Sequence, residues 1–337
     1  MRVFITHANT LLSRTREKPL RIGRCARLWK EDRERAAGWA SDDMTRGRPA
    51  LSIVVGSNNA RTSILQCLSS LIGQDRDPEV EIIVVDNSTD GTAELIDRHV
   101  PRVKRIPAPS SALIPELWAT GVRESRGDII AITTAHCVPR HDWVRATIEA
   151  HDGSAAAVGG AIEHDGSAGL ADWAVYFCRY TSFMLPFSAS FVAEIAGDNA
   201  SYGRAHIDRY RHIWEDGFWE PRVHAELRRA GLRLLLTPRI VVSHRRSFDV
   251  PRFCRQRFLH GMRFGRDRAA ELTPAWRLVY IALSPAIPLV FLARIARQVL
   301  TKARHRTKLM LALPLLLLFL AAWASGELLG YLRGPRA

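Results

Sequence analysis

Short apolar runs alternate with amphipathic stretches from Leu51 onward. The runs are continuous and a few residues long, which is typical of strands buried on both faces of a sheet. The expected strands are 51–55, 82–85, 103–106 and 129–132, and the expected helices are 61–72, 92–99 and 112–125. Strands that alternate with helices predict an α/β fold, with a mostly parallel sheet flanked by helices.

Polar turns follow three of the predicted strands. They read Gly56-Ser-Asn-Asn59, Asp86-Asn-Ser-Thr-Asp90 and Thr133-Thr-Ala-His136. The carboxyl ends of parallel strands meet at one edge of a sheet, and ligands bind in the crevice beyond that edge. We therefore expect the functional site there.

The first 48 residues differ from the rest of the chain. They are rich in arginine and lack a sustained apolar period, which predicts a basic, disordered arm over 1–48. Met44 lies just before the first strand. Residues 1–43 are therefore either such an arm or the product of an upstream start codon.

The end of the chain is strongly apolar. Segment 278–293 contains Pro285 and Pro288 and is short for a span, whereas segment 309–324 continues toward Tyr331 and approaches the roughly 20 residues that a spanning helix needs. Basic residues precede the first segment and fill the connection between the two, and basic flanks are usually cytoplasmic. We expect an interfacial or re-entrant first segment and a spanning second one; two buried helices of a soluble domain are the alternative.

Composition narrows the class of partner. The 337 residues are 47% hydrophobic, enough for a sizeable core, and 48 Lys and Arg against 34 Asp and Glu give a net charge of +14. This charge indicates an anionic partner, such as nucleic acid, an acidic membrane or a phosphate-bearing substrate. No nucleic-acid-binding motif is present, so we expect no nucleic acid partner. The basic, amphipathic stretch 251–275 is expected to lie on lipid headgroups.

The cysteines and the N-terminus bear on the compartment. The five cysteines are far apart and lack zinc-binding spacing, so reduced thiols are expected: Cys25, Cys67, Cys137, Cys178 and Cys254. Basic residues interrupt the opening stretch before any long apolar region develops, which argues against a secretory signal. We therefore expect the main domain to face the cytoplasm.

One string carries a family resemblance. Ile82-Ile-Val-Val-Asp-Asn-Ser-Thr-Asp-Gly-Thr92 places a carboxylate at the end of a buried strand, before a polar turn and a helix start. Together with the first strand and the later run Gly127-Asp-Ile-Ile-Ala-Ile132, it resembles the family 2 glycosyltransferases, whose second strand ends in V-D-x-S-x-D-x-T. The resemblance covers about 51–260 and implies a GT-A fold that binds a nucleotide-diphosphate sugar.

The resemblance implies nucleotide contacts for three residues of the first two turns. It places Asp86 on the base, with Asn59 and Asp90 as neighbours of the nucleotide. The family's P-x-Y-N-type turn keeps only its asparagine here, in Gly56-Ser-Asn-Asn59. Without the resemblance, Asp86 can also be read as a simple cap of the following turn.

The acidic motif of the family is altered. Segment 127–139 is similar to G-D-I-I-x-x-x-D-A-D-x-x-P, but Thr134 and His136 replace the two acids. The second acid normally binds Mg or Mn, which neutralises the diphosphate leaving group. His136 can coordinate Mn or offset the diphosphate as a cation, or the loop has lost metal binding. Mn or Mg is therefore the expected cofactor, and a metal-independent reaction is the open alternative.

Segment 197–204 resembles the G-x-N-x-x-x-R loop that the family places beside the donor sugar and the acceptor. This implies that Asp198 and Asn199 bind sugar hydroxyls. An ordinary polar turn has a similar composition, so the pattern by itself leaves both interpretations open.

Segment 214–231 resembles the region that carries the catalytic acid of the family. Counting back from its end places Glu220 at that position, and Glu215 and Asp216 are rivals if the register differs. The acid would deprotonate the acceptor hydroxyl while the sugar carbon is attacked from the face opposite the nucleotide, which inverts the anomeric centre.

Further residues bear on metal, phosphate or sugar binding. His244 resembles a position that supplies a histidine to metal or phosphate in some GT-A enzymes, so His136 and His244 form a possible two-histidine metal site. Arg255 or Arg257 can clamp a diphosphate, because guanidinium matches phosphate oxygens in bidentate geometry. Trp118 is a packing residue rather than a platform for the sugar.

The sequence thus predicts an inverting glycosyltransferase at the cytoplasmic face of the cell membrane, with a lipid-linked or cell-envelope glycan acceptor. Its expected parts are the GT-A domain over 49–250, the juxtamembrane region 251–275 and membrane segments within 276–332. A degenerate GT-A domain that binds a nucleotide sugar or a partner enzyme without turnover is the alternative. A nucleotidyltransferase is disfavoured, because the first turn is not rich in glycine and basic residues.

Overall fold

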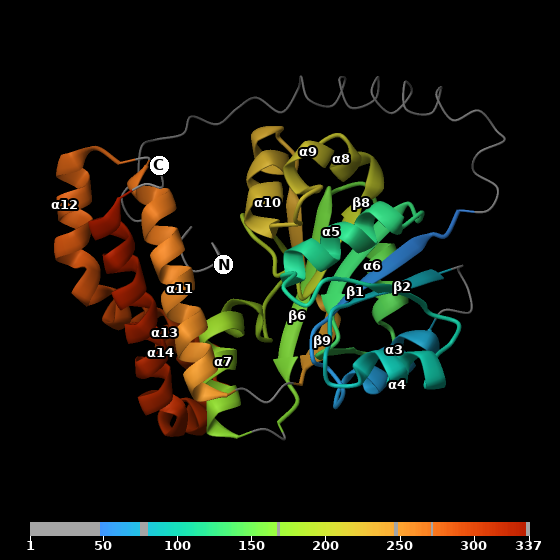
Figure 1. Ribbon diagram of the computed structural model, residues 1–337, viewed down its shortest axis with the longest axis horizontal. Coiled ribbons are helices and arrows are strands. Elements are labelled where there is room, and N and C mark those ends of the chain that lie inside the picture. The colour runs from blue at the N-terminus through green and yellow to red at the C-terminus, as the bar shows by residue number, and fades with distance from the viewer. Residues whose placement is uncertain (1–47, 75–79, 167–168, 246–248, 271, 335–337) are drawn as a thin grey trace.

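The computed structural model describes residues 48–74, 80–166, 169–245, 249–270 and 272–334. They form a mixed sheet with helices on both faces, beside a group of long C-terminal helices (Figure 1). The strands are β1 (Leu51–Ser57), β2 (Val80–Asp86), β3 (Lys104–Pro107), β4 (Ile129–Thr134), β5 (Cys137–Pro139), β6 (Ala157–His164), β7 (Ser190–Val192), β8 (Asn199–Gly203) and β9 (Leu234–His244). The helices of the sheet domain are α3 (Ile64–Ile72), α4 (Thr92–His99), α5 (Ile114–Glu124), α6 (Trp143–Ala150), α7 (Leu170–Tyr180), α8 (Arg204–Asp208), α9 (Arg211–Trp214) and α10 (Glu220–Arg229).

The strand order is β3-β2-β1-β4-β8-β6-β9-β5, and β7 pairs with β9. β1 lies parallel to β2 and β4, and β2 lies parallel to β3. β8 runs antiparallel to both β4 and β6, and β6 is parallel to β9. The four strands predicted from apolar runs therefore make the parallel half of the sheet, and the later strands make it mixed.

β1, β2 and β4 are largely buried on both faces, as continuous apolar strands require, whereas the edge strand β3 is partly exposed. Successive side chains of β1 point to opposite faces, so Ile53 and Val55 pack in the core with α3. Val54 packs on the other face with Trp118 of α5. α3, α4 and α5 coincide with the predicted helices to within a few residues, and Figure 1 shows α5 on the opposite side of the sheet from α3 and α4.

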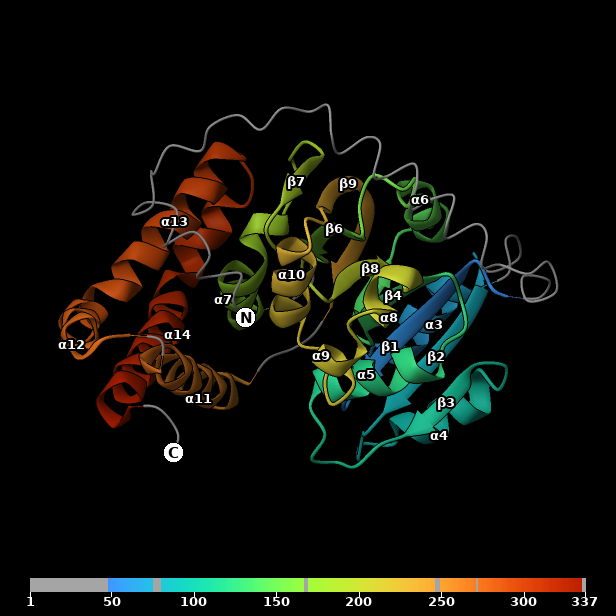
Figure 2. The same ribbon diagram turned by 90° about the horizontal axis from the view of Figure 1, so that it is seen from above.

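The C-terminal helices are α11 (Val250–Ala269), α12 (Pro274–Leu283), α13 (Ile287–Thr301) and α14 (Arg306–Arg333), and a short 3-10 turn, Ser284–Ala286, joins α12 to α13. Figure 2 shows them as a layer beside the sheet domain. α14 belongs to the same hydrophobic core as α7, through Leu309, Leu316 and Phe319.

α11 and α14 run parallel and meet along a seam of four glycines. A Cβ at Gly261 would lie 2.2 Å from the carbonyl oxygen of Trp323, and a Cβ at Gly330 would lie 2.4 Å from that of Met262. Gly265 and Gly326 face the partner backbone just as closely. Each helix thus presents glycines four residues apart, which lets the two backbones approach each other directly.

Two basic side chains hold the turn between α13 and α14 on the sheet domain. Lys302 Nζ donates to the carbonyl oxygen of Thr181 at 2.9 Å and also to that of Met184. Arg304 Nη2 pairs with Glu163 Oε2 at 2.7 Å. The turn is therefore fixed to the end of α7 and the end of β6.

Two helical stretches are long and apolar enough to cross a membrane by length and composition, Pro274–Thr301 and Arg306–Arg333. Among the described residues, most of the exposed large hydrophobic side chains lie on them: Trp276, Leu278, Val279, Leu283, Leu289, Val290, Leu300, Met310, Leu311, Leu318 and Leu332. This outer apolar face is compatible with membrane association. The expected arm over 1–48 falls almost entirely outside the described residues, and the domain limits stay predictions.

Candidate active site

The ends of β2, β1 and β4 lie side by side and carry the polar residues expected there. Asp86 is in register with Ser57, and Gly56 is in register with Thr134. Neighbouring strands are about 4.8 Å apart, so Asp86 and Thr134 lie about 10 Å from each other across β1. One edge of the sheet therefore presents a carboxylate at one end and the altered acidic motif at the other.

Asp86 is held in a tightly bonded turn. It is buried, and its Oδ1 accepts a hydrogen bond from Ser88 Oγ at 2.6 Å. The adjacent Asn87 donates from Nδ2 to the carbonyl oxygen of Ala112 at 2.7 Å, which ties the turn to the segment before α5. Asp86 is thus fixed where the strand ends, as the sequence predicted, and its contact with a base stays a prediction.

Asn59 and Asp90 shape the same edge. Asn59 adopts a left-handed conformation with φ 49°, and its Oδ1 accepts from the backbone N–H of Thr89 at 2.9 Å. Asp90 Oδ1 accepts from Thr92 Oγ1 at 2.5 Å, and Oδ2 accepts from the backbone N–H of Arg61 at 3.2 Å. Burial would raise the pKa of Asp90, but these hydrogen bonds outweigh it and lower the pKa. Both side chains connect the turns that follow β1 and β2, and their roles toward a nucleotide stay predictions.

A third carboxylate, Asp198, lies against the end of β4. Its Oδ1 accepts from Thr134 Oγ1 at 3.1 Å, and its backbone carbonyl accepts from Thr133 Oγ1 at 2.8 Å. Its Oδ2 accepts from Tyr180 OH at 2.8 Å and from Arg179 Nη2 at 3.1 Å. The structure therefore places an acid beside the threonine that replaces the family's acid.

Asp198 stays ionised although it is buried. Burial opposes its charge, but Arg179, His244 and the hydrogen bonds from Tyr180 and Thr134 outweigh burial and hold its pKa below the usual value. Arg179 responds in the opposite direction: burial opposes its charge, and the surrounding acidic groups, Asp198 and Glu220 among them, keep its pKa above the usual value. The two side chains form a charged pair at the sheet edge.

Glu220 reaches the same place from the first turn of α10. A Cβ on Gly197 would lie 2.2 Å from Glu220 Oε1 and 2.8 Å from Cγ, so the side chain lies directly over Gly197, the residue before Asp198. Burial, together with the nearby Asp198 carboxylate, raises the pKa of Glu220 above its usual value. The rivals Glu215 and Asp216 are exposed on the preceding turn. A half-buried carboxylate with a raised pKa is suited to accept a proton.

Asn199 is bonded into the scaffold on all sides. Its Nδ2 donates to the carbonyl oxygens of Ala161 at 2.8 Å and Ile240 at 3.2 Å, and its Oδ1 accepts from Trp143 Nε1 at 2.9 Å. It is almost fully buried. These bonds connect β8 to β6, β9 and α6 and so hold Asp198 in place, whereas the sugar contact expected of Asn199 stays a prediction. Trp118 is buried and packs against β1, as its interpretation as a packing residue requires.

The two candidate histidines have different neighbours. His136 Nδ1 lies 3.0 Å from Ser63 Oγ, just before α3. His244 ends β9 and lies with its ring 5.1 Å from that of Tyr180. Across the described ranges, no group of three or more His, Cys, Asp or Glu side chains is arranged to hold a metal ion. The two-histidine metal site stays a prediction that this geometry does not favour.

α11 brings basic residues toward α10. The guanidinium of Arg263 lies over the ring of Trp219, the residue before Glu220, at 5.4 Å. Arg257 is buried and lies over Trp323 at 4.3 Å, whereas Arg255 is exposed. Of the two arginines considered as a diphosphate clamp, Arg257 is therefore the one enclosed by the protein.

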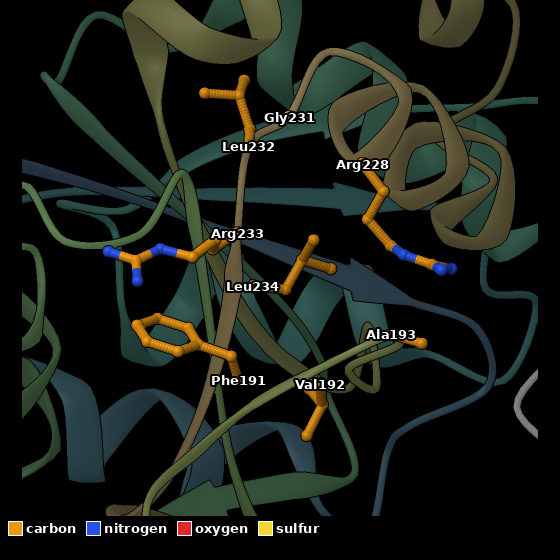
Figure 3. A pocket seen from close by; sticks show the side chains of 8 residues that line it. All are labelled: Phe191, Val192, Ala193, Arg228, Gly231, Leu232, Arg233 and Leu234. Atoms are coloured by element: carbon orange, nitrogen blue, oxygen red, sulfur yellow. The ribbon is translucent and has the colours of Figure 1, made fainter. Parts of the chain in front are cut away.

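A shallow pocket lies at the other end of the strands. It is lined by residues of β7, α10 and the start of β9, and Figure 3 shows their side chains. Leu234 in this pocket is in register with Ala157, the first residue of β6. The pocket is therefore remote from Asp86 and Thr134, which lie where their strands end.

Sequence reasoning missed Arg179 and Tyr180. Both lie on α7, far from every motif, and they join the site only through Asp198. One signal was available: Arg179 interrupts the otherwise apolar run from Trp173 to Tyr180. A single charge in an apolar helix is normally retained for a partner or a ligand.

Comparison with known proteins agrees with this arrangement. Residues 52–211 match the family model described as glycosyl transferase family 2. Among solved structures, the chain is similar to the mannosyltransferase PcManGT from Pyrobaculum calidifontis in complex with GDP-Man and Mn2+. The identity is 18%, the match covers 89% of this chain and 94% of that chain, and the TM-score is 0.51, which shows the fold alone. None of the curated proteins compared with the chain matches it.

The fold is that of a GT-A glycosyltransferase. The family 2 match over 52–211, together with the fold, gives glycosyltransferase as the class of enzyme.

Proposed function

We propose that the protein transfers a sugar from a nucleotide-diphosphate donor to an acceptor hydroxyl, with inversion at the anomeric carbon. The observation that carries this proposal is the meeting of Glu220 and Asp198 at the sheet edge that also holds Asp86. At one end of this edge, Asp86 is suited to contact the nucleobase of the donor. At the other end, the charged groups near Thr134 are suited to bind the diphosphate and the sugar.

Glu220 acts as the general base in this proposal. Its carboxylate takes the proton of the acceptor hydroxyl, the acceptor oxygen bonds to the anomeric carbon, and the bond from that carbon to the diphosphate oxygen breaks. The electron pair leaves with the nucleoside diphosphate. Burial raises the pKa of Glu220, which improves its basicity as a proton acceptor.

The family places a divalent ion beside its acidic motif, and the residues here do not fit one. Thr134 supplies a hydroxyl that donates to Asp198, and the Asp198 carboxylate already accepts from a guanidinium and a phenol. Divalent Mg and Mn require several oxygen ligands, with carboxylates as the main source of negative charge. No step proposed here passes through a metal.

The apolar C-terminal helices, which are compatible with membrane association, support a lipid-linked or envelope-glycan acceptor. The outer face of α12, α13 and α14 is apolar, and basic α11 lies beside it. α14 was expected to span the membrane. α14 packs against α7 on one side and against the arginine-rich α11 on another. If α14 crossed the bilayer, the arginines of α11 would enter the membrane with it, so this packing favours helices that lie in the membrane interface. The proposed location is the cytoplasmic face of the cell membrane.

The test is transfer and donor hydrolysis with full-length protein in detergent, using UDP, GDP and dTDP sugars. We expect turnover with one donor class, and we expect Glu220→Gln to reduce kcat by at least about a hundredfold with unchanged nucleotide affinity. Glu215→Gln is the matched control. Glu215 is exposed, so this variant should keep the wild-type kcat. Loss of activity in Asp86→Ala but not in Glu220→Gln would exclude Glu220 as the base.

The second candidate is a domain that binds a nucleotide sugar without turnover. The altered acidic motif, Thr134 with His136, is the observation that favours it. Saturable nucleotide binding with no transfer or hydrolysis of any donor, by protein that unfolds cooperatively, would establish this candidate and exclude the enzymatic one.

A further inference from the structure

Thr134 occupies a position where the family has an acid. In this chain it is the first residue of a hydrogen-bonded network. Thr134 donates to Asp198, and Asp198 accepts in addition from Arg179 and Tyr180. A divalent ion at Asp198 would lie close to the positive charge of Arg179 and would be repelled by it. The network therefore provides a cation of its own at the place where the family uses a metal.

Arg179 is anchored at one side and accessible at the other. One nitrogen lies 3.1 Å from Asp198 Oδ2, and the guanidinium carbon lies 4.8 Å from the centre of the Tyr180 ring. The side chain of Arg179 is 35% exposed, whereas that of Asp198 is 10% exposed. A guanidinium has five N–H donors in a fixed plane, so bonds to Asp198 leave others for a ligand.

Further positive groups converge on Arg179 from α11. Burial and then the charges of Arg257, Arg179 and Arg263 lower the pKa of His260 to about 4. Burial and the charge of Arg179 also lower the pKa of Arg257, to about 10. Arg263 of α11 lies over the ring of Trp219, the residue before Glu220, at 5.4 Å, so α7 and α11 both bring positive charge to this part of the site, which favours an anion there.

We propose that Arg179, held by Asp198, is the cation that binds the diphosphate of the nucleotide sugar, so that donor binding needs no divalent ion. This rests on the proposed function and adds the group that neutralises the leaving diphosphate. Arg179 is suited to bind the diphosphate because a guanidinium binds phosphate oxygens in bidentate geometry. Asp198 is a positioning residue: it orients the guanidinium and keeps it charged.

The test measures binding of UDP and GDP to full-length protein in detergent by titration calorimetry, with EDTA and with added Mn. We expect the Kd of the wild type to change less than threefold between the two conditions. Arg179→Met should weaken binding by about tenfold to a hundredfold, as expected for the loss of charged hydrogen bonds. Arg179→Lys keeps the charge beside Asp198, and it should fold normally and weaken binding about tenfold, because it lacks bidentate geometry.

Arg233→Met is the matched control, since Arg233 lies over Phe191 in the remote pocket and should leave the Kd unchanged. Nucleotide binding that EDTA abolishes and Mn restores would overturn this inference and leave the proposed function standing. EDTA-insensitive binding that both Arg179 variants retain at wild-type strength would also overturn it. No binding of any nucleotide under either condition would instead remove the proposed function itself.

Discussion

Replacing Gly197 by alanine should disable Glu220 without altering its chemistry. The added Cβ would lie 2.2 Å from Glu220 Oε1, whereas ordinary contact begins at 3.4 Å, so the carboxylate must move by 3.4 less 2.2, about 1.2 Å. The obstacle is the end of a half-buried side chain rather than backbone, so the side chain turns aside and the fold is kept. A misplacement of about 1 Å can reduce a rate by about a hundredfold, which corresponds to about 2.7 kcal/mol in the barrier.

The assay is steady-state transfer from the donor that the wild type accepts, together with thermal unfolding. We expect kcat of Gly197→Ala to fall about a hundredfold, with donor KM and unfolding temperature nearly unchanged. Gly73→Ala is the control, because Gly73 has φ −70° and the nearest atom to its added Cβ is 3.7 Å away. Wild-type kcat in a well-folded Gly197→Ala enzyme would refute the link between the position of Glu220 and the reaction.

Three further outcomes are expected. Glu220, as the proposed base, must be ionised to act, and its pKa is raised. The acid limb of the kcat/KM profile should therefore lie at higher pH than for an ordinary glutamate, and a limb that persists in Glu220→Gln would contradict this. The lowered pKa of Asp198 means that its contribution to stability is present above its unfolded-state pKa and lost as pH falls through the folded value. Asp198→Asn should therefore cost about 2 kcal/mol at neutral pH and little in acid, measured by unfolding at several pH values. Gly261→Ala places a Cβ 2.2 Å from a backbone carbonyl oxygen of α14 and should lower the free energy of unfolding by about 3 kcal/mol. Gly73→Ala is the control in the same unfolding experiment and should not lower it.

The strand-end position of Asp86 could be predicted because it follows from local pattern alone. A buried apolar run, a carboxylate and a polar turn occur within one short stretch, and parallel pairing fixes where that stretch ends in the fold. Glu220 was selected as the candidate base by counting from a neighbouring motif in the same segment, and its role stays a prediction. Both predictions depend on residues close together in the chain.

The contacts of Asp198 could not be predicted in the same way. Arg179 and Tyr180 reach it from α7, and their approach depends on how that helix packs over the sheet. Asn199 shows the complementary limit: its place in the loop suggested sugar binding, but the amide bonds β6, β9 and α6 together. Composition likewise identified α14 as apolar and left unseen that one side of it completes the core beside α7.

The clamp of Lys302 and Arg304 on the sheet domain has a consequence for substrate choice. With the turn before α14 bonded to Thr181 and Glu163, the helices of the apolar face are attached to the sheet domain that carries Glu220. Under the proposed function, a lipid acceptor held in the bilayer would present its hydroxyl at a set height above the membrane surface. We expect the enzyme to select acceptors by the distance between their lipid attachment and the reacting hydroxyl, and not by the length of the lipid chain.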